Sequence, residues 1–255
     1  MNKKTIFVTG AAAGIGRATA LKFASQGWRV AATDVDKEGL DKLKKEIGES
    51  HYYSTLNVTD KKAVEKVLAE FCGGNGGRLD LLFNNAGILS AGKFEEIGYD
   101  RHEAIISVNV KGVMNCLHGA LPYLRAASKP YVINMSSLGA VYGVPTEATY
   151  SATKFFVRGI TEALNIEWEA YGIHVCDVMP NFVNTPMVDN IEGTLKANAG
   201  VHIEPHHVAD TVWQAAHGKK LHWRVNTPGL SILDKFDFLV PRSVYKIVLK
   251  KIAEY

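Results

Sequence analysis

The sequence contains few cysteines and no hydrophobic run long enough to cross a membrane. Its three cysteines, Cys72, Cys116 and Cys176, are widely separated and form no CxxC or other metal-binding spacing. This pattern indicates reduced thiols in a cytoplasmic protein rather than a disulfide-stabilised secreted protein. The apolar run near the N-terminus is too short for the core of a signal peptide. We therefore expect no transmembrane segment.

The sequence also lacks a strong charge of either sign. It has 29 lysines and arginines against 26 acidic residues, a net charge of +3. The lysine pairs at 44–45 and 250–251 are better explained as exposed helix faces than as a nucleic-acid-binding surface. A content of 47% hydrophobic and 22% charged residues is typical of a soluble globular protein. The length of 255 residues suits one α/β domain over 1–255.

Short β-branched runs alternate with longer amphipathic segments along the chain. The runs predict seven strands, at 5–8, 29–33, 52–56, 79–83, 131–135, 174–178 and 222–225. The amphipathic segments predict helices within 10–27 and over 37–47, 61–71, 100–126, 150–171 and 205–217. This alternation predicts a single-domain, doubly wound α/β (Rossmann) fold with a seven-stranded parallel sheet. Ligands of such folds bind beyond the carboxyl ends of the strands.

A glycine-rich turn follows the first predicted strand. Gly10, Gly14 and Gly16 form the spacing GxxxGxG. Glycines allow a tight turn and let the backbone approach a pyrophosphate, to which the following helix presents free N–H groups. A purely structural strand–helix turn is the alternative interpretation. The position after an N-terminal strand, and the acid that ends the second strand, favour a dinucleotide site.

That acid, Asp34, predicts which dinucleotide the site takes. A carboxylate here accepts hydrogen bonds from the adenosine ribose and repels a 2′-phosphate. No arginine follows it directly, and Ala13 stands where a basic residue could contact that phosphate. We therefore expect NAD(H) rather than NADP(H), although Lys37 is near enough in sequence to keep NADP(H) open. A solvent-exposed acid at a strand end is the alternative interpretation of Asp34.

Tyr150 and Lys154 are the candidate catalytic pair. Residues at i and i+4 share one face of a helix. A tyrosine has a pKa near 10, and an adjacent lysine cation favours the phenolate and lowers that pKa. The pair could therefore donate and accept a proton at neutral pH. Taken alone, such a pair most often shares a helix face for no chemical reason, so its meaning depends on the other motifs.

Together, these motifs resemble the short-chain dehydrogenase/reductase family, in its compact single-domain branch, over residues 5–230. The motifs that carry the resemblance occur in the family's order: residues 9–16, Asp34, Asn57-Val58, Asn84 to Gly87, Asn109, Ser136-Ser137, Tyr150 with Lys154, and Pro180 to Thr185. The resemblance implies an NAD-dependent oxidoreductase that transfers hydride between the cofactor and a secondary alcohol or ketone.

The resemblance also implies a role for each catalytic residue. Tyr150 would be the general acid/base, and Lys154 would lower its pKa and bind the nicotinamide ribose. Ser137, thirteen residues before Tyr150, would hold the substrate oxygen, with Ser136 as the less favoured candidate. Asn109 would hold a water molecule that links Lys154 to solvent.

The cofactor contacts implied by the resemblance extend over most of the chain. They are Gly10, Gly14, Ile15, Gly16, Asp34, Asn57, Val58, Asn85, Ala86, Gly87, Tyr150, Lys154, Pro180, Val183 and Thr185. Two positions depart from the family pattern. Asn57 replaces the usual aspartate, but an amide can still contact adenine. Asn181 replaces a glycine, and asparagine tolerates left-handed backbone better than other residues with a side chain.

Substrate choice is expected to depend on a loop near 187–203. Its composition at 190–200 predicts a mobile lid. The candidate wall residues Leu138, Val144, Phe182 and Met187 favour a hydrophobic alcohol or ketone. The histidines at 202, 206 and 207 lack a completing ligand set, so we expect no metal site.

A C-terminal amphipathic helix is predicted near 243–254. Its apolar stripe could form a subunit interface or cover the substrate cleft, which we favour over a peripheral membrane contact or an exposed tail. The resemblance implies a homodimer or homotetramer formed through the helices at 100–126 and 150–171.

Two other functions remain open at this stage. One is a regulatory protein that senses NAD without turnover, but the intact set Asn109, Ser137, Tyr150 and Lys154 argues against it. The other is a sugar-nucleotide epimerase or dehydratase, for which the chain leaves little room for a substrate domain. An NADP-dependent carbonyl reductase is the closest variant of the favoured function.

Overall fold

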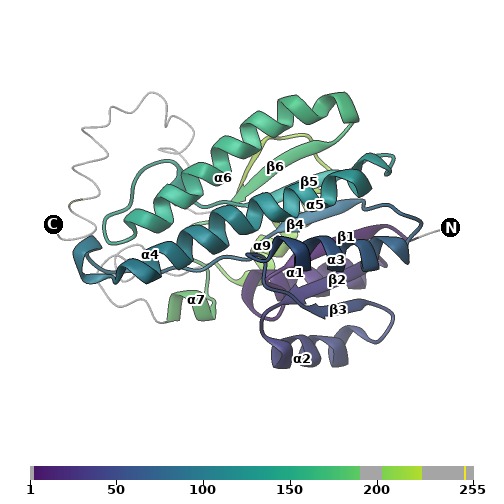
Figure 1. The fold of residues 1–255 in the computed structure, drawn as a ribbon, viewed down its shortest axis with the longest axis horizontal. Helices are drawn as coiled ribbons and strands as arrows, with labels where there is room; N and C mark the ends of the chain where they lie inside the picture. Colours follow the sequence, from purple (N-terminus) through teal and green to yellow (C-terminus); the bar gives the residue numbers. More distant parts are fainter. Residues whose placement is uncertain (1–2, 190–202, 226–249, 251–255) are drawn as a thin grey trace.

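The computed structural model describes residues 3–189, 203–225 and 250. They form a seven-stranded parallel sheet covered by helices on both faces (Figure 1), which confirms the predicted fold class. In sheet order the strands are β3 (Tyr52–Thr55), β2 (Arg29–Asp34), β1 (Thr5–Thr9), β4 (Leu81–Asn84), β5 (Tyr131–Met135), β6 (His174–Met179) and β7 (His222–Arg224). The order of strands reverses direction between β1 and β4, which is where such folds bind their ligands.

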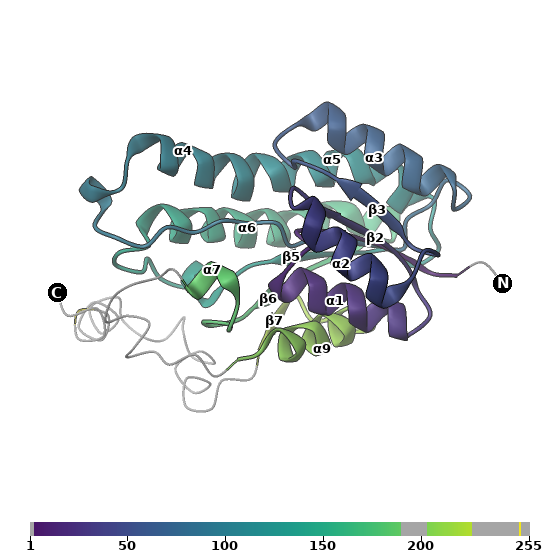
Figure 2. The same ribbon diagram turned by 90° about the horizontal axis from the view of Figure 1, so that it is seen from below.

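Helices of the two faces complete a three-layer arrangement, seen edge-on in Figure 2. One face carries α1 (Gly14–Ser25), α2 (Lys37–Ile47) and α9 (Pro205–Ala215), and the other carries α3 (Lys61–Gly73), α5 (Val113–Arg125) and α6 (Ala148–Glu167). Two apolar layers result, one containing Phe23, Trp28 and Leu43 and the other containing Phe7 and Phe71. Both faces of the central strands are buried, which explains why those strands are almost continuously hydrophobic.

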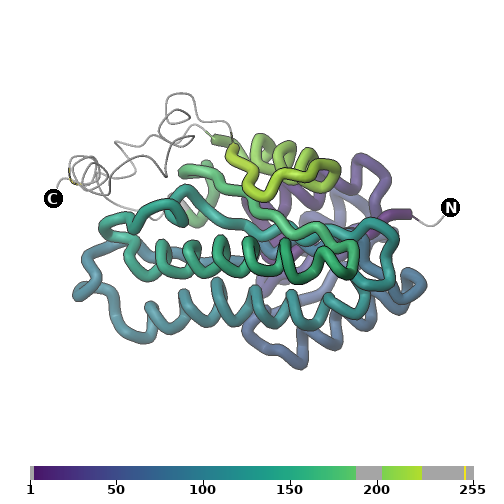
Figure 3. Tube along the Cα trace, turned by 90° about the horizontal axis from the view of Figure 1, so that it is seen from above, coloured from purple at the N-terminus to yellow at the C-terminus, as the bar shows by residue number. Residues whose placement is uncertain are grey.

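The helix predicted over 100–126 is interrupted. It consists of α4 (Tyr99–Ile106), a π-helical segment (Ser107–Gly112) and α5, and α6 runs beside it (Figure 3). Asn109 lies in the π-helical segment, a kind of irregularity that is frequent at functional sites. Asn109 therefore lies at the one irregular segment between the two regular helices α4 and α5.

Two predicted elements fall largely outside the described residues. They are the loop near 187–203, of which the structure describes the short helix α7 (Pro186–Asp189) and residue 203, and the helix near 243–254. At the start of α9, His207 Nδ1 accepts a hydrogen bond from the Glu204 backbone N–H at 3.1 Å. No group of His, Cys, Asp or Glu side chains within 3–189 and 203–225 could hold a metal ion. None of the helices described is long and apolar enough to cross a bilayer.

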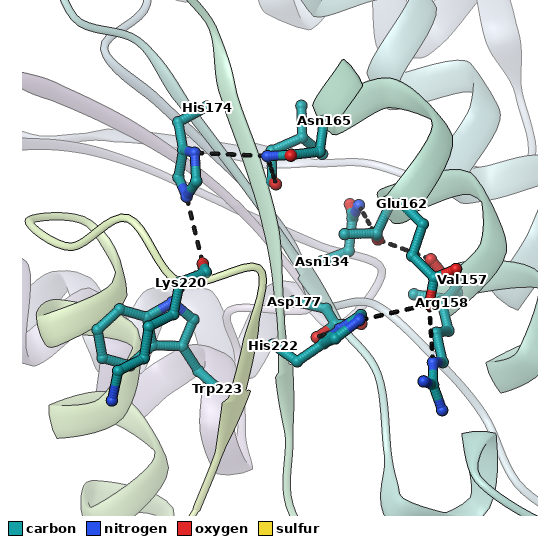
Figure 4. Close-up of polar contacts among 12 residues, drawn as sticks. Asn134, Val157, Arg158, Glu162, Asn165, His174, Asp177, Lys220, His222 and Trp223 are labelled. Carbon is teal, nitrogen blue, oxygen red and sulfur yellow. Dashed lines mark hydrogen bonds and ion pairs between the residues drawn. The ribbon is translucent and has the colours of Figure 1, made fainter. Parts of the chain in front are cut away.

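The edge strand β7 is held by a polar network that the sequence did not predict. His222 lies between Asp177 of β6 and Glu162 of α6 (Figure 4), with its ring nitrogens 2.9 Å and 3.3 Å from their carboxylate oxygens. The Asp177 side chain is fully buried, and burial raises its pKa, whereas His222 acts in the opposite direction. A buried carboxylate needs such a partner, so His222 offsets the cost of placing Asp177 in the core.

We predict that His222→Ala lowers the free energy of unfolding by about 2 kcal/mol, because it leaves the Asp177 carboxylate buried without its partner. Asp177→Asn in the same chain should restore most of the loss. Urea denaturation of both variants measures this, with His118→Ala, an exposed histidine of α5, as the control. Equal losses for the single and double variants would contradict the pairing.

Candidate functional site

A cavity of about 680 Å³ lies at the carboxyl ends of the strands. It is lined by the segments that follow β1, β2, β3, β4, β5 and β6 and by the start of α6. Its volume is in the usual range for a small-molecule site. The position matches the ligand site expected at the point where the strand order reverses.

The cavity brings together nearly all of the residues predicted from sequence. Those that line it are Gly10, Gly14, Ile15, Asp34, Asn57, Val58, Asn85, Ala86, Gly87, Ser137, Tyr150, Lys154, Pro180, Val183 and Thr185. The predicted wall residues Leu138, Val144, Phe182 and Met187 line it as well. Gly16 and Asn109 do not, and their surroundings indicate supporting roles.

Gly16 allows α1 to pack closely against the glycine-rich turn. A Cβ atom at this position would lie 2.0 Å from the Gly10 carbonyl oxygen, so no other residue fits without displacing the turn. Gly10 has φ of +68°, a conformation that favours glycine. Asn85 holds the turn from the other side, because its Nδ2 donates to the carbonyls of Thr9 and Gly10 at 2.9 and 3.1 Å.

The start of α1 meets the requirements of a phosphate site. Ala13 at its N-cap makes no side-chain capping bond, and its first turn contains no acidic residue. The backbone N–H groups there are therefore not used by a side chain and lie beside the cavity that Ala13, Gly14 and Ile15 line. Such N–H groups favour an anion.

Asp34 is fixed at the edge of the same cavity. Its Oδ2 accepts from the Ala12 N–H at 2.9 Å, and its Oδ1 accepts from the Asp36 N–H at 3.0 Å. These bonds tie the carboxylate to the glycine-rich turn and orient it before any ligand binds. Asn57 is engaged in a similar way, since its Oδ1 accepts from the Thr59 N–H at 3.0 Å, which orients its side-chain amide at the cavity.

Lys154 is buried beneath the cavity. Its Nζ donates to the Met135 carbonyl oxygen at 2.7 Å and lies 5.4 Å from the centroid of the Tyr150 ring. Burial lowers the pKa of Lys154 to about 8. The ammonium is thus held by a backbone acceptor and is partly deprotonated near neutral pH.

Tyr150 shows a pKa shift opposite to the one that the sequence predicts. Burial raises its pKa, the charge of Glu147 raises it further, and a hydrogen bond with Ser137 acts in the other direction. The predicted lowering by Lys154 is not seen, because removal from water outweighs other effects and the ammonium points to Met135. Tyr150 is therefore a neutral phenol at pH 7, which is a proton donor.

Ser137, rather than Ser136, contacts Tyr150. The Ser137 Oγ also accepts a hydrogen bond from the Gly139 N–H at 3.1 Å, which fixes its rotamer at the end of β5. Ser136 Oγ is buried and has no hydrogen-bond partner among the residues described. This arrangement agrees with the sequence-based preference for Ser137 as the residue nearest the reacting atoms.

The Asn109 side chain is fully engaged in supporting bonds. Its Nδ2 donates to the Ile88 carbonyl at 3.0 Å and to Thr153 Oγ1 at 3.1 Å, and its Oδ1 accepts from the Ile88 N–H at 2.9 Å. These bonds join the segment after β4 to α6. The predicted contact with a water molecule therefore does not come from the Asn109 side-chain N–H groups.

Asn181 lines the cavity and does not adopt a left-handed backbone conformation. Within the described residues, the single non-glycine residue with positive φ is Thr146, so the tolerance of asparagine for a left-handed backbone is not used at Asn181. The segment after β6 accommodates an ordinary backbone at this position.

The sequence analysis missed Glu147. Its side chain lines the cavity, is 4% exposed, and has an Oε1 atom without a hydrogen-bond partner in the described part of the chain. Burial raises its pKa from 4.5 to about 7. The available signal was an acidic residue three positions before Tyr150, which places the two side chains on one side of the helix start.

We predict that Glu147→Gln becomes more stable relative to the wild type as pH rises from about 4.5 to about 7. The unfolded carboxyl loses its proton near 4.5 and the folded one near 7, so the wild type loses up to about 3 kcal/mol over this interval. Glutamine does not titrate and avoids this loss. Chemical denaturation of both proteins at pH 4.5, 6 and 8 measures the difference, and a pH-independent difference would contradict it.

Comparison with known proteins agrees with this site. The sequence profile of the short chain dehydrogenase family matches residues 4–196. The 3-oxoacyl-(acyl-carrier-protein) reductase FabG of Thermotoga maritima is 39% identical over 196 residues, covering 74% of this chain and 77% of that protein.

Solved structures share the fold over most of its length. The 3-ketoacyl-(acyl-carrier-protein) reductase of Brucella melitensis, complexed with NADH, has a TM-score of 0.80 at 26% identity and covers 87% of this chain and 96% of that one. ElxO with NADP bound has a TM-score of 0.80 at 26% identity, covering 90% and 99%. The profile match and the 39% identical relative show that this chain belongs to the short-chain dehydrogenase family of oxidoreductases.

Proposed function

We propose that this protein transfers hydride between NAD(H) and a hydrophobic secondary alcohol or ketone, with Tyr150 as the general acid/base. The observation that carries the proposal is that one cavity contains both the glycine-rich turn with Asp34 and the group Ser137, Tyr150 and Lys154. A protein that only binds a dinucleotide has no need of the second group. The related reductases of Thermotoga and Brucella support a carbonyl substrate on an acyl chain.

The residues present fit a nicotinamide dinucleotide. The uncapped start of α1 offers N–H groups to a pyrophosphate, and the oriented Asp34 carboxylate offers acceptors to ribose hydroxyls. Pro180, Val183 and Thr185 line the same cavity and would contact the nicotinamide. The cofactor, when bound, supplies or accepts the hydride.

The catalytic residues would handle the proton and the substrate oxygen. The Tyr150 phenol donates its proton to the carbonyl oxygen during reduction, while the Ser137 hydroxyl binds the same oxygen. Lys154 is held beside Tyr150 by the Met135 carbonyl and would bind the nicotinamide ribose.

Asp34 supports NAD(H) over NADP(H). Its carboxylate is oriented by Ala12 and Asp36, and a 2′-phosphate placed beside it would meet a fixed negative charge. The structural relatives bind either cofactor, NADH in the Brucella reductase and NADP in ElxO. The preference therefore rests on this residue.

We also propose a cytoplasmic homodimer or homotetramer. The helices expected to pair carry exposed apolar side chains, which are Ile106 on α4, Met114 on α5 and Phe155 and Ile166 on α6. Exposed apolar surface on long adjacent helices favours association, and sedimentation would measure it. All three cysteines are buried free thiols.

Tyr150→Phe is predicted to reduce ketone turnover by at least about 100-fold, because it removes the proton donor while keeping the ring. NADH binding, measured by fluorescence titration, should be retained. Tyr99→Phe is the matched control, since Tyr99 is 79% exposed on α4. Turnover by Tyr150→Phe close to that of the control would overturn the proposed mechanism.

The wild type is predicted to bind NADH more tightly than NADPH. Asp34→Ala should shift the ratio of the two dissociation constants toward NADPH by roughly tenfold, because it removes the repulsive charge. Asp41→Asn, an exposed acid of α2, is the control. A wild type that binds NADPH more tightly would instead identify an NADP-dependent carbonyl reductase.

A further inference from the structure

Glu147 lies beside the reacting centre but takes no part in the mechanism above. It occupies the N-cap position of α6, three residues before Tyr150, and its side chain lines the cavity at 4% exposure. Residues three apart on a helix face are neighbours. A ligand whose carbonyl is bound by Tyr150 and Ser137 can therefore also reach Glu147 in the same cavity.

The Glu147 carboxyl has no hydrogen-bonding role within the described protein. The N-cap side chains that accept from the first helical turn are mainly those of Ser, Thr, Asp and Asn, and Glu147 makes no such bond. Its Oε1 is buried and lacks a partner among the described residues. A buried polar atom left in this state calls for an explanation, and a ligand is one.

Comparison with the other carboxylate in the cavity sharpens the point. Among the described residues that line it, Asp34 and Glu147 are the two acids. Both oxygens of Asp34 accept backbone hydrogen bonds, from Ala12 and Asp36. The fold therefore supplies hydrogen-bond donors to both carboxylate oxygens of Asp34, but it supplies none to the buried Oε1 of Glu147 among the described residues.

The backbone before Glu147 is strained. Thr146 has φ of +66°, a conformation that β-branched residues rarely adopt. Its carbonyl accepts from the Gly92 N–H at 2.9 Å, and the Glu147 carbonyl accepts from the Ser151 N–H at 2.7 Å. The strained turn is thus held from both sides, a pattern that clusters at ligand-binding sites.

Apolar side chains such as Leu138, Val144 and Phe182 line the same cavity. A buried carboxyl group in this cavity gains a hydrogen-bond partner when a ligand brings an O–H or N–H donor. A ligand without a donor leaves it unpaired, which is how buried polar groups reject analogues.

We propose that Glu147 is a specificity-determining residue that binds a hydroxyl or amine on the carbon next to the substrate carbonyl. This inference rests on the proposed function, because it takes Tyr150 as the residue at the carbonyl. It narrows the substrate class to functionalised ketones with an apolar chain. A hydroxyl donates a hydrogen bond to the carboxyl oxygen, and an ammonium forms a charge-assisted pair with the carboxylate.

Three ketones of equal chain length test the inference: 2-decanone, 1-hydroxy-2-decanone and 1-amino-2-decanone. Their kcat/KM values are measured with NADH and NADPH for the wild type, Glu147→Gln and Glu147→Leu. Glu167→Gln is the control, an exposed acid at the far end of α6. Circular dichroism and cofactor titration verify that each variant is folded.

The wild type should prefer one or both functionalised ketones over 2-decanone by roughly tenfold or more. Glu147→Gln keeps an acceptor oxygen, so it should retain a preference for the hydroxy ketone and lose a preference for the amino ketone. Glu147→Leu should lose both preferences, so that its kcat/KM values for the three ketones become similar. The control should behave as the wild type, and the retained preference identifies which donor the site takes.

Failure of the inference and failure of the proposed function give different results. A wild type that reduces all three ketones equally, or a Glu147→Leu variant that keeps the preference, overturns the role of Glu147 alone. A wild type that reduces none of them overturns the proposed function for these ketones. In that case calorimetry tests the role of Glu147 by measuring the binding of three alcohols. The role requires that 1-amino-2-decanol or 1,2-decanediol binds more tightly than 2-decanol, and that Glu147→Leu removes this difference.

Discussion

The burial of three ionisable side chains in one cavity governs its chemistry, because removal from water shifts the pKa of each of them. Burial lowers the pKa of Lys154 and raises the pKa values of Tyr150 and Glu147, and it is the largest cause in each case. All three shifts favour the neutral form. The surroundings of the catalytic group therefore disfavour charge, and a charge that develops on a ligand is stabilised strongly by nearby donors, since little water screens it.

The same constraint explains where sequence reasoning succeeded and where it failed. The spacing of Tyr150 and Lys154 predicted that they share a helix face, and they do, with Lys154 Nζ 5.4 Å from the ring centroid. Spacing contains no information about solvation or about the Met135 carbonyl that holds the ammonium. The direction of the Tyr150 pKa shift follows from burial, which depends on the packed fold rather than on neighbours in sequence.

Local signals account for most of the predicted fold. The bounds of α2 were predicted as observed, since Asp36 caps its start through the Gly39 N–H and Gly48, with φ of +91°, ends it. The π-helical segment around Asn109 has no comparable local pattern, because its residues are also compatible with an α-helix. Its Asn109 contacts are with Ile88 and Thr153, which approach only once the fold has formed. Tertiary contacts of this kind are what a single sequence does not reveal.

Two buried acids show how the fold separates stability from recognition. Asp177 is buried in the sheet, and its Oδ1 contacts His222 whether or not a ligand is present, while its Oδ2 has no hydrogen-bond partner among the described residues. Glu147 is nearly as buried, yet the described chain supplies its Oε1 with no partner and holds a strained turn beside it. A buried polar group without a partner lowers the stability of the free protein. A ligand that supplies the partner removes this free-energy cost and therefore binds in preference to an analogue that does not. The oriented Asp34 at the other end needs no such ligand, which is why we assign cofactor choice to Asp34 and substrate choice to Glu147.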